Sequence, residues 1–131
     1  MGYLLDTMVI SWAVRDLHQA PAVVRALRSE GDLAVSAISL LELRRGLPAE
    51  DYHRATDELV DVGVVPMDGA IAEAAGEYLL RCYEEGYRVD FFAGVIATTA
   101  ARTGRALVTY SPAQYPLANF NIVQLASVLK R

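Results

Sequence analysis

Residues 87–111 read YRVDFFAGVIATTAARTGRALVTYS, and this stretch decides the fold. Its first part, from Phe91 to Arg102, is rich in small and apolar residues and is followed by Gly104, which predicts a buried helix. Ala106 to Thr109 then predicts a short buried strand. A buried helix that leads into a buried strand is typical of proteins in which helices cover a parallel sheet.

The rest of the chain repeats this alternation. The periodicity of apolar residues and the turn residues between them predict strands at 3–5, 33–38, 64–67 and 122–125, and helices at 9–15, 20–29, 39–47, 50–60 and 68–85. Strands that alternate with helices predict an α/β fold, a parallel sheet with helices on both faces. A length of 131 residues without repeats or linkers predicts a single domain over residues 1–131.

The composition favours a folded chain in the cytoplasm. Hydrophobic residues make up 53% and charged residues 21%, so a core is expected and disorder is not. No apolar run reaches the roughly 18–20 residues of a membrane span, and no basic segment precedes an apolar one, so neither a membrane helix nor a signal peptide is expected. Cys82 is the only cysteine, which excludes a disulfide framework and a Cys-based zinc site.

The net charge of −4 is opposite in sign to that of a protein that binds nucleic acid through bulk electrostatics. It is compatible with a nuclease, because a site that holds divalent cations must itself be acidic. Arg44 and Arg45 form a local basic pair that could lie beside such a site and contact phosphates. The alternative for this pair is a solvated helix face.

Acidic and polar residues follow the predicted strands, where sites of open α/β sheets lie. Asp6 follows the first strand, Glu42 lies shortly after the second, and Ser111 lies just beyond Thr109. Convergent carboxylates without Cys or His nearby form a hard-oxygen site that suits Mg²⁺ or Mn²⁺. Each acid has a structural alternative, because Asp6 can cap the helix after it and Glu42 can form a capping box with Ser39.

The residue before the decisive helix, Asp90, is open to two interpretations. It precedes Phe91 and is a suitable N-cap for the helix. It could also bring a third carboxylate to the site. Beyond the following strand, Tyr110 and Tyr115 could stack on an unpaired base or form a hydrophobic lid over the core.

Three segments of the chain resemble the PIN domains of VapC-type toxins from toxin–antitoxin pairs. They are YLLDTMVIS at 3–11, SAISLLELRRG at 36–46 and AGVIATTAARTGRALVTYSPAQYP at 93–116. The family implies a PIN-like α/β/α sandwich and a Mg²⁺-dependent endoribonuclease that hydrolyses phosphodiester bonds of RNA. It further implies a homodimer, for which the helices at 20–29 and 50–60 are the expected contacts, and a VapB-like antitoxin that inserts a peptide near the site.

The match to the family motifs is incomplete. Asp6 matches the first metal-binding aspartate of the family, and Glu42 matches the glutamate of its second motif. The third acid of the family falls on Ala93, and a further Asn or Asp of the family falls on Ser111. Met8 stands where the family usually has Asn.

The resemblance and the residues together give a set of expected roles. Asp6, Glu42 and Asp90 are the expected catalytic residues, with Asp90 in place of the missing acid. Asp6 and Asp90 are the expected ligands of Mg²⁺ or Mn²⁺. The expected substrate contacts are Arg44, Arg45 and Ser111. The alternative is a catalytically inactive PIN-fold module that binds RNA or a protein.

Overall fold

The computed structural model describes residues 2–128, and over this range its centre is a five-stranded parallel sheet. The strand order is β3-β2-β1-β4-β5, and every neighbouring pair is parallel. The strands are β1 (Gly2–Leu5), β2 (Asp32–Ser36), β3 (Gly63–Val65), β4 (Ala106–Thr109) and β5 (Ile122–Gln124). The predicted parallel α/β sheet is confirmed.

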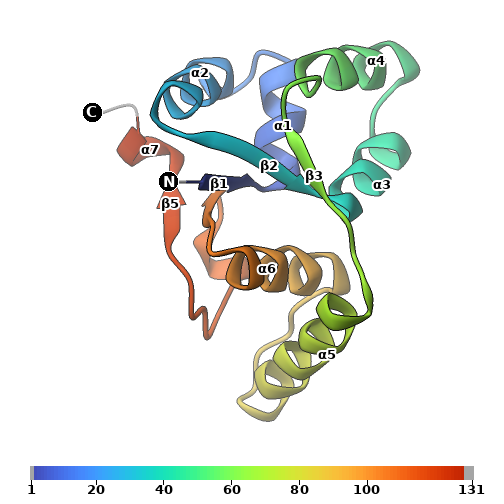
Figure 1. Cartoon of the computed structure of the whole chain (residues 1–131), viewed down its shortest axis with the longest axis vertical. Coiled ribbons are helices and arrows are strands. Elements are labelled where there is room, and N and C mark those ends of the chain that lie inside the picture. Colours follow the sequence, from blue (N-terminus) through green and yellow to red (C-terminus); the bar gives the residue numbers. More distant parts are fainter. Residues whose placement is uncertain (1, 129–131) are drawn as a thin grey trace.

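Helices cover both faces of this sheet (Figure 1). They are α1 (Thr7–Val14), α2 (Ala20–Glu30), α3 (Ala37–Gly46), α4 (Ala49–Glu58), α5 (Gly69–Glu84), α6 (Phe91–Thr103) and α7 (Leu125–Val128). Figure 1 shows α1, α2 and α4 on one side of the sheet and α5 and α6 on the other. No helix within residues 2–128 has the length and apolar character needed to cross a membrane.

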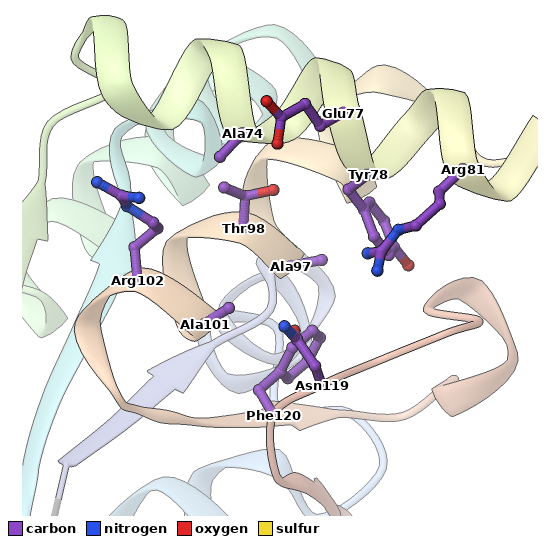
Figure 2. Close-up of a pocket in the computed structure, with 10 residues that line it drawn as sticks. All are labelled: Ala74, Glu77, Tyr78, Arg81, Ala97, Thr98, Ala101, Arg102, Asn119 and Phe120. Atoms are coloured by element: carbon purple, nitrogen blue, oxygen red, sulfur yellow. The ribbon is translucent and has the colours of Figure 1, made fainter.

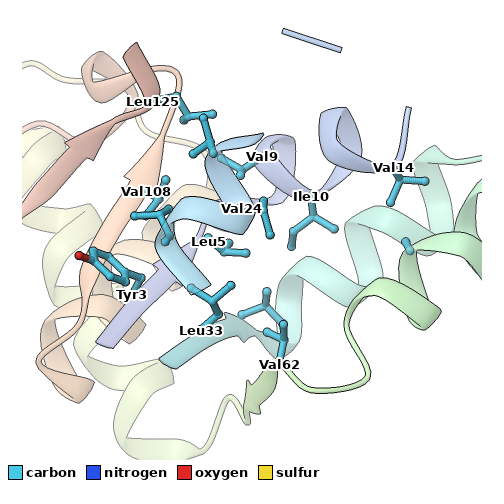
Figure 3. Close-up of a cluster of buried hydrophobic side chains, with 14 of the residues drawn as sticks. Tyr3, Leu5, Val9, Ile10, Val14, Val24, Leu33, Val62, Val108 and Leu125 are labelled. Carbon is cyan, nitrogen blue, oxygen red and sulfur yellow. The ribbon is translucent and has the colours of Figure 1, made fainter. Parts of the chain in front are cut away.

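Two apolar clusters join the helices to the sheet, because successive side chains of a strand point to opposite faces. Leu5 of β1 packs with Val9 and Val24 on the side of α1 and α2 (Figure 3). Leu4 packs with Ile96 on the side of α6. Both leucines are almost fully buried, so each face of β1 holds its helix layer in place.

The sequence prediction is wrong at the end of the second strand. The strand was expected to reach Ile38, with Ser39 as the cap of the next helix, but β2 ends at Ser36. Ser36 is the N-cap of α3, and its hydroxyl accepts a hydrogen bond from the Ile38 N–H at 3.2 Å. Ser39 is buried in the first turn of α3. The capping box between Ser39 and Glu42 therefore does not form.

Helix α6 is buried along most of its length, as its small residues predict. Gly94 allows close packing against α5, since a Cβ at this position would lie 2.8 Å from the Leu79 side chain. Gly104 ends the helix with a φ of 67°, a backbone conformation that favours glycine. The start of α6 lies at the carboxyl end of the sheet, where the predicted site is expected.

Candidate active site

Asp6 and Thr109 meet where the neighbouring strands β1 and β4 end. The Asp6 N–H donates to the Val108 carbonyl at 3.0 Å, which extends the pairing of the two strands by one residue. The Thr109 hydroxyl donates to Asp6 Oδ2 at 2.7 Å. The end of β4 therefore fixes the orientation of the Asp6 carboxylate.

Asp6 is only 6% exposed, which is unusual for a carboxylate. Burial raises the pKa of Asp6 above its ordinary value, while hydrogen bonds from Thr109 and Tyr115 oppose that rise. The nearby backbone N–H groups of Thr7 and Met8 also lower the pKa of Asp6, but by less than Thr109 and Tyr115 do. Neither N–H makes a capping hydrogen bond with the Asp6 side chain. The expectation that Asp6 caps the helix is met in position but not in hydrogen bonding.

Glu42 reaches the same region from α3. The Thr7 hydroxyl donates to Glu42 Oε1 at 2.6 Å and lies 2.8 Å from the Ser39 hydroxyl. Burial raises the pKa of Glu42, the Thr7 hydrogen bond opposes the rise, and the negative charges of Asp6 and Asp90 add to it. Glu42 is therefore close enough to Asp6 and Asp90 for their negative charges to repel its own.

Asp90 is the N-cap of α6. Its Oδ1 accepts a hydrogen bond from the Ala93 N–H at 2.8 Å, which confirms the predicted cap. The side chain is exposed, so its second oxygen remains available to solvent or a ligand. Ala93 itself is buried one turn into α6, at the wall of the same pocket.

A pocket of about 300 Å³ contains all three acids. Thr7, Thr109, Tyr110, Ser111, Gln114 and Tyr115 supply further polar atoms, and Met8, Trp12, Phe92, Ala93 and Ile96 supply apolar surface. No arginine, lysine or histidine is among the lining residues of the described chain. The pocket therefore concentrates negative charge without an internal counter-ion.

The chemistry of these donors fits a divalent cation that keeps part of its water shell. Carboxylate and hydroxyl oxygens are the ligands that Mg²⁺ prefers, and it is often held by only one or two carboxylates together with waters and substrate phosphates. Within residues 2–128, no three His, Cys, Asp or Glu side chains are grouped closely enough to enclose a metal ion. Asp6 with one further acid fits such a cation, whereas a closed cage of protein ligands does not form.

The three expected substrate contacts lie at different places around the pocket. Ser111 lines it, and its N–H donates to the Thr109 hydroxyl at 3.0 Å. Arg45 lies at the rim, with its guanidinium 6.0 Å from the ring centre of the lining residue Phe92. Arg44 instead lies over the ring of Tyr52, 5.1 Å from its centre.

Tyr115 packs into the apolar cluster on the side of α6, which agrees with the hydrophobic alternative and not with base stacking. It is 3% exposed and cannot offer its ring to an unpaired base. Its hydroxyl instead interacts with the Asp6 carboxylate, and burial together with the charge of Asp6 raises the pKa of Tyr115 far above its ordinary value. Tyr115 therefore stays neutral and supports Asp6 as a hydrogen-bond donor.

Tyr110 is partly exposed and remains beside the pocket. Its ring lies 4.0 Å from the ring of Trp12, and its hydroxyl donates to the His18 carbonyl at 3.1 Å. Sequence reasoning did not identify Thr7 as a partner of Glu42. The signal that could have found it is its place directly after Asp6, because the first turn of α1 faces the same edge of the sheet.

Comparisons with known proteins agree with this architecture. The crystal structure of VapBC2 from Rickettsia felis bound to a promoter DNA fragment is similar, with a TM-score of 0.81 at 19% identity over 95% of this chain and 98% of that chain. FitAcB from Neisseria gonorrhoeae gives a TM-score of 0.76 at 23% identity over 96% and 99% of the two chains. VapBC-1 from nontypeable Haemophilus influenzae gives 0.79 at 18% identity over 96% and 99%.

At these identities the similarity shows a shared fold. No curated protein matches the chain significantly. The family model described as PIN domain matches residues 3–115, which include every strand except β5 and the whole carboxylate pocket. The chain belongs to the PIN domain family.

Proposed function

We propose that this protein is a VapC-type toxin of the cytoplasm that hydrolyses phosphodiester bonds of RNA with Mg²⁺ or Mn²⁺. The observation that carries the proposal is the pocket in which Asp6, Glu42 and Asp90 converge without a lysine or arginine among the described lining residues. Two of these carboxyl groups have a raised pKa. Such a pocket favours a cation, which would relieve both burial and mutual repulsion of the acids.

A bound divalent cation would supply charge neutralisation at the scissile phosphate and a lower pKa for the attacking water. Asp6 is the principal ligand, because Thr109 and Tyr115 hold its carboxylate in a fixed orientation. Asp90 is the second ligand, through the oxygen that does not cap α6. A ligand already oriented by its neighbours loses little entropy when it binds.

Glu42 is the proton acceptor in this proposal. Its raised pKa brings it closer to neutral pH and makes it a stronger base than an ordinary glutamate. The Thr7 hydroxyl holds one carboxylate oxygen, which leaves the other to take a proton from the attacking water. Ser111 and Arg45, at the wall and the rim of the pocket, are placed to contact phosphates of the strand, with Arg44 farther out beside Tyr52.

The site is weaker than the family pattern implies. Ala93 brings a methyl group, rather than a carboxylate, to the wall of the pocket, and Ser111 brings a neutral hydroxyl. Fewer negative charges reduce the affinity for Mg²⁺. We therefore expect slow cleavage that requires high concentrations of metal.

Cleavage of a defined RNA with and without Mn²⁺ tests this function. The unmodified protein should cleave slowly, Asp6→Asn should abolish cleavage, and Ala93→Asp should raise it and tighten Mn²⁺ binding. Adding Ser111→Asp to Ala93→Asp should raise it further. Equal activity of the unmodified protein and Asp6→Asn would assign the cleavage to a contaminant and contradict the proposal.

A VapB-like antitoxin is the proposed partner. The similar solved structures are described as VapBC and FitAB-type complexes. No cation is among the described lining residues of the pocket, and Arg45 lies only at its rim. An arginine of a partner segment would supply one and displace the metal. Co-expression with the product of the neighbouring gene should yield a complex that does not cleave RNA, and failure to co-purify would contradict the pairing.

A PIN-fold module that binds RNA without cleaving it is the second candidate. The buried Ala93 at the place of an acid, together with the absence of a three-residue metal cluster within residues 2–128, favours it over an efficient nuclease. RNA binding that needs no metal and is insensitive to Asp6→Asn, with no cleavage at any Mn²⁺ concentration, would identify this module.

A further inference from the structure

A second cavity, of about 320 Å³, lies between α5, α6 and the loop that precedes β5. Figure 2 shows its lining residues, which come from these three segments. The cavity shares no lining residue with the carboxylate pocket. Its volume is that of a site for a small ligand.

The space exists because of the residues that pack around it. Ala74, Ala97 and Ala101 have short side chains and leave room between the two helices. Tyr78 of α5 closes one side, and its hydroxyl donates to the Pro116 carbonyl at 2.6 Å, which ties the loop to the helix. The cavity is therefore formed before any ligand enters.

One buried polar side chain and three exposed ones line this cavity without a polar partner within residues 2–128. Thr98 is only 6% exposed, yet its hydroxyl makes no hydrogen bond in the described chain, and Figure 2 shows it turned into the cavity. Glu77 and Arg102 form no ion pair there, and the Asn119 amide makes no hydrogen bond. Solvent reaches the Thr98 hydroxyl from the cavity, and Glu77, Arg102 and Asn119 are exposed, so a polar ligand that enters would replace water on these side chains.

We propose that the cavity binds a nucleoside monophosphate. Figure 2 shows Arg81 and Arg102 on opposite sides of the space, and guanidinium groups suit a phosphate. The lining residue Phe120 offers an aromatic ring to a base. Carboxylates such as Glu77 accept hydrogen bonds from ribose hydroxyls.

The same side chains disfavour other anions of similar size. An acidic peptide would bring several carboxylates close to Glu77, and these like charges repel one another. Inorganic phosphate would use a guanidinium but leave Glu77, Asn119 and the ring of Phe120 unused. A nucleotide offers its phosphate to the two guanidinium groups, its ribose hydroxyls to Glu77 and its base to the ring of Phe120.

Isothermal titration of the full chain with adenosine 5′-monophosphate, in EDTA, tests the proposal. We expect saturable binding that Thr98→Val weakens several-fold at unchanged stability. The double variant Arg81→Ala/Arg102→Ala should weaken binding about tenfold or more, the usual effect of losing hydrogen bonds to a charged group. Arg88→Ala is the matched control, because Arg88 is exposed and lines neither this cavity nor the carboxylate pocket, and it should bind as the unmodified chain does.

Further ligands distinguish a free nucleotide from the 5′-phosphorylated end of an RNA strand. Adenosine and inorganic phosphate should each bind more weakly than the nucleotide. Competition by a 5′-phosphorylated RNA, but not by its 5′-hydroxyl form, would identify the end of an RNA strand as the source, and no competition by either would identify the free nucleotide. The use of EDTA and of the Asp6→Asn background keeps the result independent of RNA cleavage. No saturable binding, or equal loss in Arg88→Ala and the double variant, would overturn the proposal.

Discussion

At the scale of single residues, the carboxylate pocket places function in conflict with stability. Asp6 is buried with only neutral hydrogen-bond donors beside its side chain, and burial raises its pKa. Glu42 lies in the field of two other acids. A folded protein keeps such an arrangement when a ligand relieves it, and this conflict can be measured.

Asp6→Asn should make the protein more stable at pH 7. The folded-state pKa of Asp6 is raised above its ordinary value of 3.8, so below pH 3.8 both states are protonated and the residue costs nothing. As pH rises through this range the unfolded chain ionises first, and the folded state loses stability until its own carboxyl has ionised. A pKa that is higher by one in the folded than in the unfolded state corresponds to about 1.4 kcal/mol of the free energy of unfolding.

Chemical denaturation of Asp6→Asn and the unmodified protein between pH 3 and pH 7 checks this expectation. The advantage of the variant should shrink as the pH falls. Mn²⁺ should stabilise the unmodified protein and not the variant. Asp57→Asn, an exposed acid on α4, is the control and should change little. A less stable Asn variant at pH 7 would show that the hydrogen bonds of the carboxylate outweigh its burial.

Two substitutions at Asp90 separate its cap from its charge. Asp90→Ala should lower the free energy of unfolding by about 1 kcal/mol, because the Ala93 N–H loses its partner. Asp90→Asn should cost less, because asparagine caps nearly as well, but it removes the charge from the pocket. If Asp90 is a metal ligand, Asn should weaken Mn²⁺ binding at almost full stability, and unchanged Mn²⁺ binding would restrict Asp90 to the cap.

At the scale of elements, local signals predicted the helices and strands well and failed where two signals competed. The cap of α6 at Asp90 and its end at Gly104 were read correctly, because each depends on one residue with a strong preference. The end of β2 was missed because Ser36 and Ser39 are both suitable caps, and burial of Ser39 decides between them. The contact of Tyr115 with Asp6 was beyond prediction, since it depends on how the loop after β4 meets the end of β1.

The packing of α5 against α6 gives a test at this scale. Gly94→Ala should destabilise the protein by about 1–3 kcal/mol, the usual cost of an extra methyl in a tight core, because the new Cβ would lie 2.8 Å from Leu79. Gly76→Ala on α5 is the matched control, since nothing lies within 4 Å of its Cβ, and it should stabilise by up to about 1 kcal/mol. Thermal unfolding measures both, and Leu79→Ala should relieve the effect of Gly94→Ala. Equal effects of the two glycine substitutions would contradict the close contact.

At the scale of the whole molecule, the exposed apolar side chains offer a second candidate dimer surface beside the one expected from the sequence. Helix α2 turns Val23, Val24 and Leu27 into the core, and α4 buries only Ala55. The end of α5 and the start of α6 carry the exposed residues Leu80, Tyr83 and Phe91, and Tyr83 and Phe91 line one hollow of the surface. Exposed aromatic clusters of this kind mark protein–protein contacts.

We expect a homodimer through this end of α5. Tyr83 and Phe91 are 77% and 78% exposed, and pairing would remove them from water. Sedimentation of the unmodified chain should give twice the mass of one chain, and Leu80→Glu/Tyr83→Glu should give the monomer, because like charges would face each other across the two-fold axis. Val60→Glu is the control, since Val60 follows α4 and is 86% exposed, and it should leave the dimer intact. Dissociation by Val60→Glu alone would return the contact to α4, and a monomeric unmodified chain would exclude the dimer.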